Sequence, residues 1–85
     1  MIETMNRSPY SARYESLRAW LKAKRGEKNM SIRALAEKLE LHHSIIGKIE
    51  QGGRKIDVLE FVEYCKALEV DPHEGLDLII SGKRS

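Results

Sequence analysis

The sequence has 85 residues, of which 41% are hydrophobic and 33% are charged, and its formal net charge is +2. A chain of this length forms one small domain near the lower limit for a self-sufficient core, so it has no room for a two-domain enzyme with a deep cleft. No run approaches the roughly 18 to 20 apolar residues of a membrane span, and residues 1–7 lack the apolar core of a secretory signal. Because Cys65 is the only cysteine, an intramolecular disulfide is excluded.

The spacing of apolar residues predicts five short helices and no strand, since no alternating β-branched run is flanked by turn residues. The first helix is expected to begin at Ser8-Pro9, with serine as N-cap and proline at the first helical position, and to end near Gly26. Its apolar face consists of Tyr10, Tyr14, Leu17 and Leu21. Ser31 is expected to cap the second helix, whose apolar stripe consists of Ile32, Leu35, Ala36 and Leu39.

The third helix is expected in the segment HHSIIGKIEQGG, residues 42–53, with an end at Gly52-Gly53. Its inward face consists of Ile45, Ile46 and Ile49. Asp57 is expected to cap a fourth helix with the strongest amphipathic pattern of the chain, made by Val58, Phe61, Val62, Cys65 and Leu68. The sequence Asp71-Pro72-His73-Glu74 is close to a capping box and predicts the start of a fifth helix, which continues through Leu76, Ile79 and Ile80 and is expected to pack on the fourth.

The link between the second and third helices is only Glu40 and Leu41. So short a link forces a steep crossing, as in a DNA-binding helix-turn-helix. Ala36 is small where the two helices would cross, and Ile46 and Ile49 would anchor the third helix from beneath. The opposite face of the third helix then carries one stripe at helical spacing that can enter a major groove, made by His43, Ser44, Gly47, Lys48 and Gln51.

Gly47 is unusual in the interior of a helix, where glycine costs roughly 1 kcal/mol relative to alanine. Its position on the outward stripe offers a reason for that cost. Without a side chain at this point, a groove wall or a phosphate can approach the backbone closely.

Three sequence motifs stand at fixed spacing between Met30 and Pro72. They are S-x-x-x-L-A-x-x-L at 31–39, I-x-x-I-E-x-G at 46–52 and K-A-L-x-V at 66–70. Together they resemble the Cro/phage-repressor type of helix-turn-helix domain, the Xre family, over about residues 15–80. The resemblance implies an all-α, compact five-helix, lambda-repressor-like DNA-binding domain at 9–80, with an N-terminal extension at 1–8 and a polar tail at 81–85.

The resemblance also implies a cytoplasmic bacterial or phage transcriptional regulator, a repressor or autoregulator, that binds a palindromic operator in double-stranded DNA as a homodimer. Base-reading positions fall on His43, Ser44 and Lys48, with Gly47 between them. A structural ion pair that joins the first helix to the recognition helix falls on Arg25 and Glu50. Neither catalytic residues nor a cofactor or metal is expected, because no Ser/His/Asp or Cys/His set and no phosphate-binding loop is recognisable.

Contacts to the DNA backbone are expected from the polar residues around this helix, because such contacts need only a positive charge or an N–H donor. These residues are Arg33, Gln51, Gly53, Arg54 and Lys55. The charge distribution agrees, since residues 1–55 have a balance of +6 and residues 56–85 a balance of −4. A basic front of this kind orients a small domain toward a polyanion.

Three positions depart from the family pattern. Ile32 stands where the family usually has a phosphate-clamping glutamine, so that contact is expected to be lost. Glu40 replaces the glycine of the turn and is expected in a left-handed conformation, at a cost of about 1 kcal/mol. His42 replaces the usual Ser or Thr cap of the recognition helix.

The fifth helix carries a dense apolar group that a small monomer cannot bury completely. It is made by Leu76, Leu78, Ile79 and Ile80, and we expect it to form a twofold dimer interface. An alternative function is a protein-interaction module, such as an antitoxin that binds a toxin or a domain that has lost DNA binding. Ile32 and the acidic last third of the chain motivate this alternative.

Overall fold

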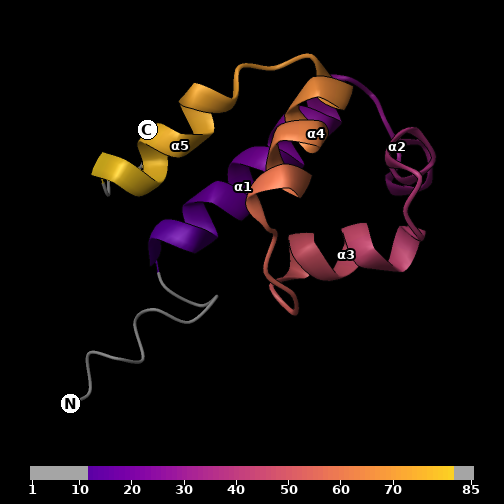
Figure 1. The fold of residues 1–85 in the computed structure, drawn as a ribbon, viewed down its shortest axis with the longest axis horizontal. Coiled ribbons are helices and arrows are strands. Elements are labelled where there is room, and N and C mark those ends of the chain that lie inside the picture. Colours follow the sequence, from indigo (N-terminus) through magenta and orange to yellow (C-terminus); the bar gives the residue numbers. More distant parts are fainter. Residues whose placement is uncertain (1–11, 82–85) are drawn as a thin grey trace.

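The computed structural model describes residues 12–81, which fold into five helices without a strand (Figure 1). In chain order these are α1 (Ala12–Glu27), α2 (Ile32–Leu39), α3 (His43–Gln51), α4 (Val58–Leu68) and α5 (Pro72–Ser81). The predicted all-α, five-helix fold is therefore confirmed. The expected helix start at Ser8-Pro9, its residue Tyr10, the extension 1–8 and residues 82–85 lie outside the described residues, and Ser81 belongs to α5 rather than to a tail.

The helix ends follow local side-chain chemistry. Ser31 caps α2 by accepting a hydrogen bond of 3.0 Å from the backbone N–H of Ala34. Glu40 ends α2 with φ 57° and ψ 41°, the left-handed conformation expected for it. The expected capping box at the start of α5 is wrong in detail, because Asp71 accepts from the N–H of His73 at 2.9 Å, one residue before Glu74.

A full capping box is found instead at the start of α4. The Asp57 carboxylate accepts from the N–H of Glu60 at 2.7 Å, and the Glu60 carboxylate accepts from the N–H of Asp57 at 3.1 Å. The two hydrogen bonds satisfy donors that would otherwise be unpaired at the helix start. This box fixes the Glu60 side chain beside the loop that follows α3.

The hydrophobic core lies where α1, α2, α3 and α4 meet. Its completely or almost completely buried members are Leu17, Leu21, Leu35, Ala36, Ile46, Ile49, Phe61, Tyr64, Cys65 and Leu68. Cys65 is inside this core, and burial raises the pKa of its thiol to about 11. A thiol so placed fills space and is not a nucleophile at neutral pH.

Helix α5 packs on α4, as the sequence pattern predicted, and more extensively on α1, which that pattern did not predict. Gly75 permits both contacts, because a Cβ atom there would lie 2.8 Å from the ring of Trp20 in α1 and 3.1 Å from that of Phe61 in α4. The missing side chain thus lets the α5 backbone approach these two aromatic rings closely. Arg13 adds a hydrogen bond of 3.3 Å to the carbonyl of Ile79 near the end of α5.

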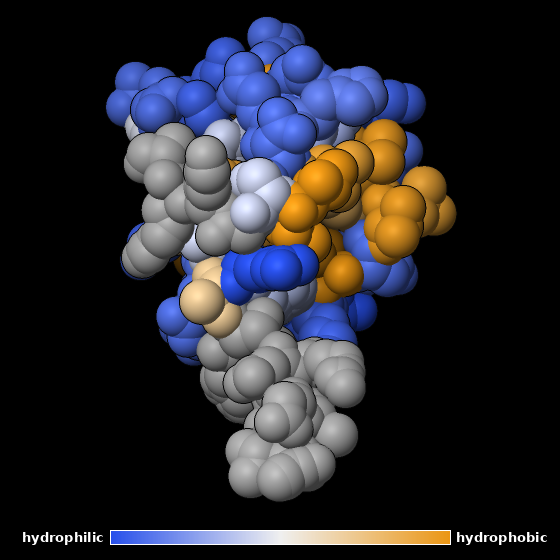
Figure 2. All heavy atoms as spheres, turned by 90° about the vertical axis from the view of Figure 1, so that its left-hand side faces the viewer, coloured by the Kyte–Doolittle hydropathy of each residue, from blue (hydrophilic) through white to orange (hydrophobic). Residues whose placement is uncertain are grey.

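An apolar groove of about 390 Å³ opens between α1, α4 and α5. Val58 was expected to face the core but is 79% exposed, because it lies at the rim of this groove and no described residue covers it. The other exposed large apolar side chains of the described residues are Leu59, Leu76 and Ile80. Figure 2 shows apolar side chains gathered on one face of the molecule, surrounded by polar ones. Each helix within residues 12–81 is too short or too polar to cross a bilayer.

Candidate nucleic-acid interface

Helices α2 and α3 form the helix-turn-helix crossing. Leu35 of α2 and Ile46 and Ile49 of α3 are at most 1% exposed, so one face of α3 is fully committed to the core. The turn is closed by a hydrogen bond of 2.9 Å from the N–H of Leu41 to the carbonyl of Ala36. Ile32 also packs against the core, consistent with an apolar residue in place of a phosphate clamp.

A bidentate ion pair joins α1 to α3 at the position that the family resemblance implies. Arg25 donates two hydrogen bonds of 2.8 Å to the Glu50 carboxylate and a third, also 2.8 Å, to the carbonyl of Met30. The Glu50 side chain is 4% exposed, and the pKa of Arg25 is raised mainly by its hydrogen bonds to Glu50. Tyr64 of α4 donates its hydroxyl to the same carboxylate, and burial raises the pKa of this phenol. Helices α1 and α4 therefore fix the orientation of α3.

The face of α3 opposite to the core carries the residues predicted to read bases. Ser44, Lys48 and Gln51 are exposed, and His43 and Gly47 are partly exposed. Lys48 makes no ion pair with any residue in the range 12–81. The positive charge of nearby Arg33, followed by desolvation, lowers the pKa of the His43 imidazole. The charge of Arg33 therefore disfavours protonation of His43.

The N-terminus of α3 is capped by His42. Its Nδ1 atom accepts from the N–H of Ser44 at 3.2 Å and lies 2.9 Å from the Ser44 hydroxyl. The His42 and His43 rings stack with centroids 4.4 Å apart, and no described group of three or more His, Cys, Asp or Glu residues can hold a metal ion.

Packing among the described residues does not require glycine at position 47. A Cβ atom at this position would meet nothing within 4 Å. Alanine therefore fits the folded domain, and any requirement for glycine at 47 comes from a molecule that approaches this face.

Gly52 and Gly53 end α3 with their backbone N–H groups. Gly52 adopts φ 91° and donates to the carbonyl of Ile49 at 3.2 Å, while Gly53 donates to the carbonyl of Lys48 at 2.8 Å. The Gly53 amide was expected to bind phosphate, and in this structure its N–H is used to close the helix. The same N–H cannot donate to a phosphate without opening the helix end.

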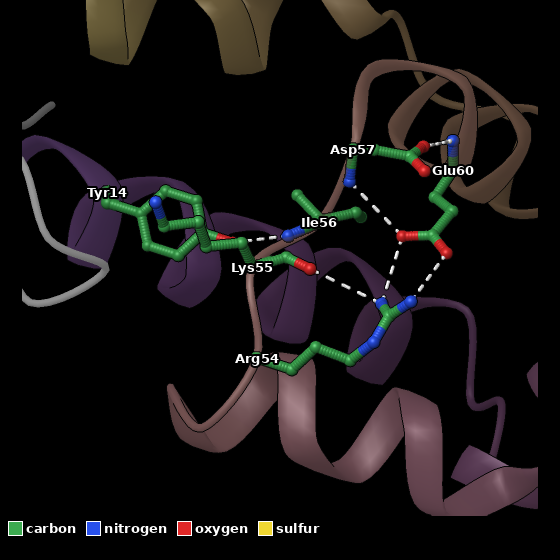
Figure 3. Close-up of polar contacts among 6 residues, drawn as sticks. All are labelled: Tyr14, Arg54, Lys55, Ile56, Asp57 and Glu60. Atoms are coloured by element: carbon green, nitrogen blue, oxygen red, sulfur yellow. Dashed lines mark hydrogen bonds and ion pairs between the residues drawn. The ribbon is translucent and has the colours of Figure 1, made fainter.

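The loop after α3 contains an arginine that was also expected to bind phosphate. Arg54 instead donates two hydrogen bonds of 3.0 Å to the Glu60 carboxylate and one of 3.3 Å to the carbonyl of Lys55 (Figure 3). Its side chain is 36% exposed and that of Glu60 is 19% exposed. The hydrogen bonds to Glu60 raise the pKa of Arg54, and those from Arg54 lower the pKa of Glu60. In the structure the charge of Arg54 is therefore compensated within the chain.

Tyr14 and Glu60 were missed as residues that shape this interface. The Tyr14 hydroxyl accepts a hydrogen bond of 2.6 Å from the N–H of Ile56 and so ties the loop to α1. Glu60 had a sequence signal, because an acidic residue three positions after a capping Asp57 predicts a side chain folded back on the helix start. No local signal marked the contact between Tyr14 and Ile56, which are 42 residues apart.

Comparisons with known proteins agree with this geometry. The model of the helix-turn-helix family HTH_3 matches residues 21–74. The chain is also similar to a solved structure described as an XRE-family like protein from Pseudomonas syringae pv. tomato str. DC3000. The two share 27% sequence identity with a TM-score of 0.80, over 96% of this chain and 95% of that chain. No curated protein matches the sequence.

Proposed function

This chain belongs to the Xre family of helix-turn-helix proteins and is a DNA-binding transcriptional regulator, and we propose that it reads a specific operator with α3 in the major groove. One observation carries the proposal. The buried face of α3 is fixed by the core and by Glu50, while the opposite face presents exposed and partly exposed polar groups at helical spacing. A rigid helix with such a face matches the width of a B-DNA major groove.

The base-reading residues in this proposal are His43, Ser44 and Lys48, with Gly47 as the point of close approach. Lys48 donates to O6 or N7 of guanine, the acceptors that distinguish this base in the major groove. His43 and Ser44 lie one turn earlier and reach neighbouring base edges or phosphates. Arg33 and Gln51 flank this set and contact the DNA backbone, together with Lys55 of the following loop.

The regulator acts as a homodimer through the apolar face of α5. Ile80 is 72% exposed and Leu76 is 41% exposed, and exposed apolar side chains next to an apolar groove favour a protein contact. Leu78 and Ile79 are half-buried and contribute their outer edges. A twofold dimer places two recognition helices about 34 Å apart, so the operator is palindromic with half-sites one DNA turn apart. Bound over a promoter, such a dimer blocks access and represses, which includes repression of its own promoter.

Selection of bound duplexes from a random DNA pool tests this function. We expect an enriched palindrome with a half-site spacing of about 10 base pairs. Enrichment of a single, non-symmetric half-site would contradict the dimer but would still agree with base recognition by α3. Absence of any enrichment, together with no binding at low salt, would contradict operator recognition itself.

The same apolar groove favours a second candidate, a contact with a different protein such as a toxin. Its rim includes Asp57 and the acidic helices α4 and α5 lie beside it, which suits a basic partner. Light scattering separates the two, because a chain that stays monomeric at high concentration leaves this face for another protein.

A further inference from the structure

We propose that Glu60 withholds Arg54 from the DNA backbone, so that Lys55 makes the phosphate contact of the 52–57 loop and Arg54 serves as a positioning residue. The inference rests on the proposed DNA-binding function and assigns the backbone contact within it. It also gives Glu60 a role in specificity, since a phosphate contact adds affinity for every sequence equally.

The first support is the way in which the donors of Arg54 are occupied. The guanidinium has five N–H groups, and three of them are used by Glu60 and by the carbonyl of Lys55. The two oxygens of Glu60 take the parallel pair of donors that a phosphate would take in a bidentate contact. A DNA phosphate must therefore displace a carboxylate that already has matching geometry (Figure 3).

The second support is that Glu60 is held in place independently of Arg54. Its carboxylate also accepts from the N–H of Asp57, and it lies at the N-terminus of α4, where the helix dipole stabilises a negative charge. Its side chain is 19% exposed, so water screens the pair only in part. Release of Arg54 would leave this carboxylate without its cation and close to DNA of the same charge.

The third support is that the pair of Arg54 and Glu60 leaves other donors of the loop available for a phosphate. Lys55 is exposed and forms no ion pair with any residue between 12 and 81. Arg54 donates a hydrogen bond to the Lys55 carbonyl, and the Tyr14 hydroxyl accepts one from the N–H of Ile56. In the same part of the chain the N–H groups of Arg54 and Lys55 have no hydrogen-bond partner. The loop thus presents one ammonium group and two donors in a fixed backbone geometry.

The test measures how binding to duplex DNA depends on salt. The probe is a fluorescent duplex of mixed sequence, since the contact is independent of sequence. Each phosphate neutralised by a protein cation contributes about 0.9 to the slope of log Kobs against log salt. In the variant Glu60→Gln the released Arg54 gains a phosphate contact, so we expect the slope to steepen by about 0.9. Between about 50 and 200 mM salt, this variant should lose roughly three- to fourfold more affinity than the wild type. An unchanged or shallower slope overturns the proposal, because Arg54 would then already contact phosphate or make no such contact when released.

A matched control is Glu63→Gln, which removes the same charge from an exposed position of the same helix. It should leave the slope at the wild-type value, and a slope as steep as that of Glu60→Gln would attribute the effect to net charge and overturn the proposal. Circular dichroism verifies that each variant is folded at the temperature of measurement.

A second variant keeps the test decisive if Glu60→Gln is unstable. The double variant Arg54→Gln/Glu60→Gln removes both charges and should retain the wild-type slope. In Lys55→Gln, by contrast, the slope of log Kobs against log salt should become shallower by about 0.9. If the slope of the double variant becomes shallower by as much as that of Lys55→Gln, the proposal is overturned. Failure of the wild type to bind the duplex at low salt is a different result, which contradicts the DNA-binding function and not the role of Glu60.

Discussion

Arg25 of α1 and Glu50 of α3 face each other in two parallel hydrogen bonds of 2.8 Å, and the Glu50 side chain is 4% exposed. This pair holds the last turn of the recognition helix against the first helix. The Tyr64 hydroxyl extends the contact to α4. The orientation of the exposed face of α3 therefore depends on charged groups on the buried side of the helix.

Removal of one partner of this pair should destabilise the domain strongly. Glu50→Gln leaves the Arg25 charge largely buried without its anion, and we expect the free energy of unfolding to fall by about 3 to 5 kcal/mol. Urea unfolding followed by circular dichroism measures the change. The pair of Lys24 and the exposed Glu27, 3.5 Å apart, is the control, since Glu27→Gln should cost at most about 1 kcal/mol. Equal effects of the two substitutions would contradict a special role for the buried pair.

Gly47→Ala should stabilise the folded domain and weaken operator binding. A methyl group meets nothing within 4 Å, so alanine gains its helix propensity, about 1 kcal/mol, without a steric cost. On the groove-facing stripe the same methyl group keeps DNA away from the backbone. Thermal unfolding and a mobility shift measure the two effects separately. Unchanged binding would mean that the glycine is incidental.

Gly75→Ala is the matched comparison for that experiment. The added methyl group would lie 2.8 Å from the Trp20 ring, so here the substitution should destabilise the domain. A stabilised Gly75→Ala variant would contradict the close packing of α5 on α1.

The exposed end of α5 should control the oligomeric state. We expect Ile80→Asp to remain folded, because this side chain is 72% exposed, and to shift the protein from dimer to monomer. Light scattering after size exclusion measures this mass. Ala23→Asp places the same charge on an exposed position of α1 and should leave the dimer intact. A persistent dimer in Ile80→Asp would exclude α5 as the interface.

Acid should weaken the pair of Arg54 and Glu60. Arg54 holds the pKa of the Glu60 carboxyl below its ordinary value of 4.5, so the pair contributes its full stability above that value and loses it as the pH falls through the lower, folded-state pKa. The difference in unfolding free energy between wild type and Glu60→Gln should therefore shrink from about pH 6 to about pH 3. Urea unfolding at each pH measures it, and a constant difference would contradict a stabilising ion pair.

Much of the fold follows from local patterns along the chain. Ser31, Asp57 and Asp71 mark helix starts because their carboxylate or hydroxyl oxygens accept backbone N–H groups at those points. Glu40 adopts its left-handed conformation because the short turn requires it, whatever residue stands there. These signals depend on neighbours within a few residues, so the sequence alone is sufficient to find them.

Contacts between distant residues were not predictable in the same way. Arg54 was expected to contact the DNA backbone, and its pairing with Glu60 depends on the path of the loop between them. That path is set by Gly52 and by Tyr14, which lies far away in the sequence. Likewise, α5 docks on α1 because Gly75 meets Trp20, a contact that the apolar spacing of either helix does not contain.

Base reading by α3 predicts a specific defect for Lys48→Ala, which removes the exposed cation of this helix. The measurement is the ratio of two affinities at one salt concentration, for the duplex selected from the random pool and for a mixed-sequence duplex. We predict that the ratio falls roughly 5- to 150-fold, which corresponds to about 1 to 3 kcal/mol. The reason is that a base contact discriminates between DNA sequences and a phosphate contact does not. An equal loss of affinity for both duplexes, with the ratio unchanged, would contradict base reading by Lys48.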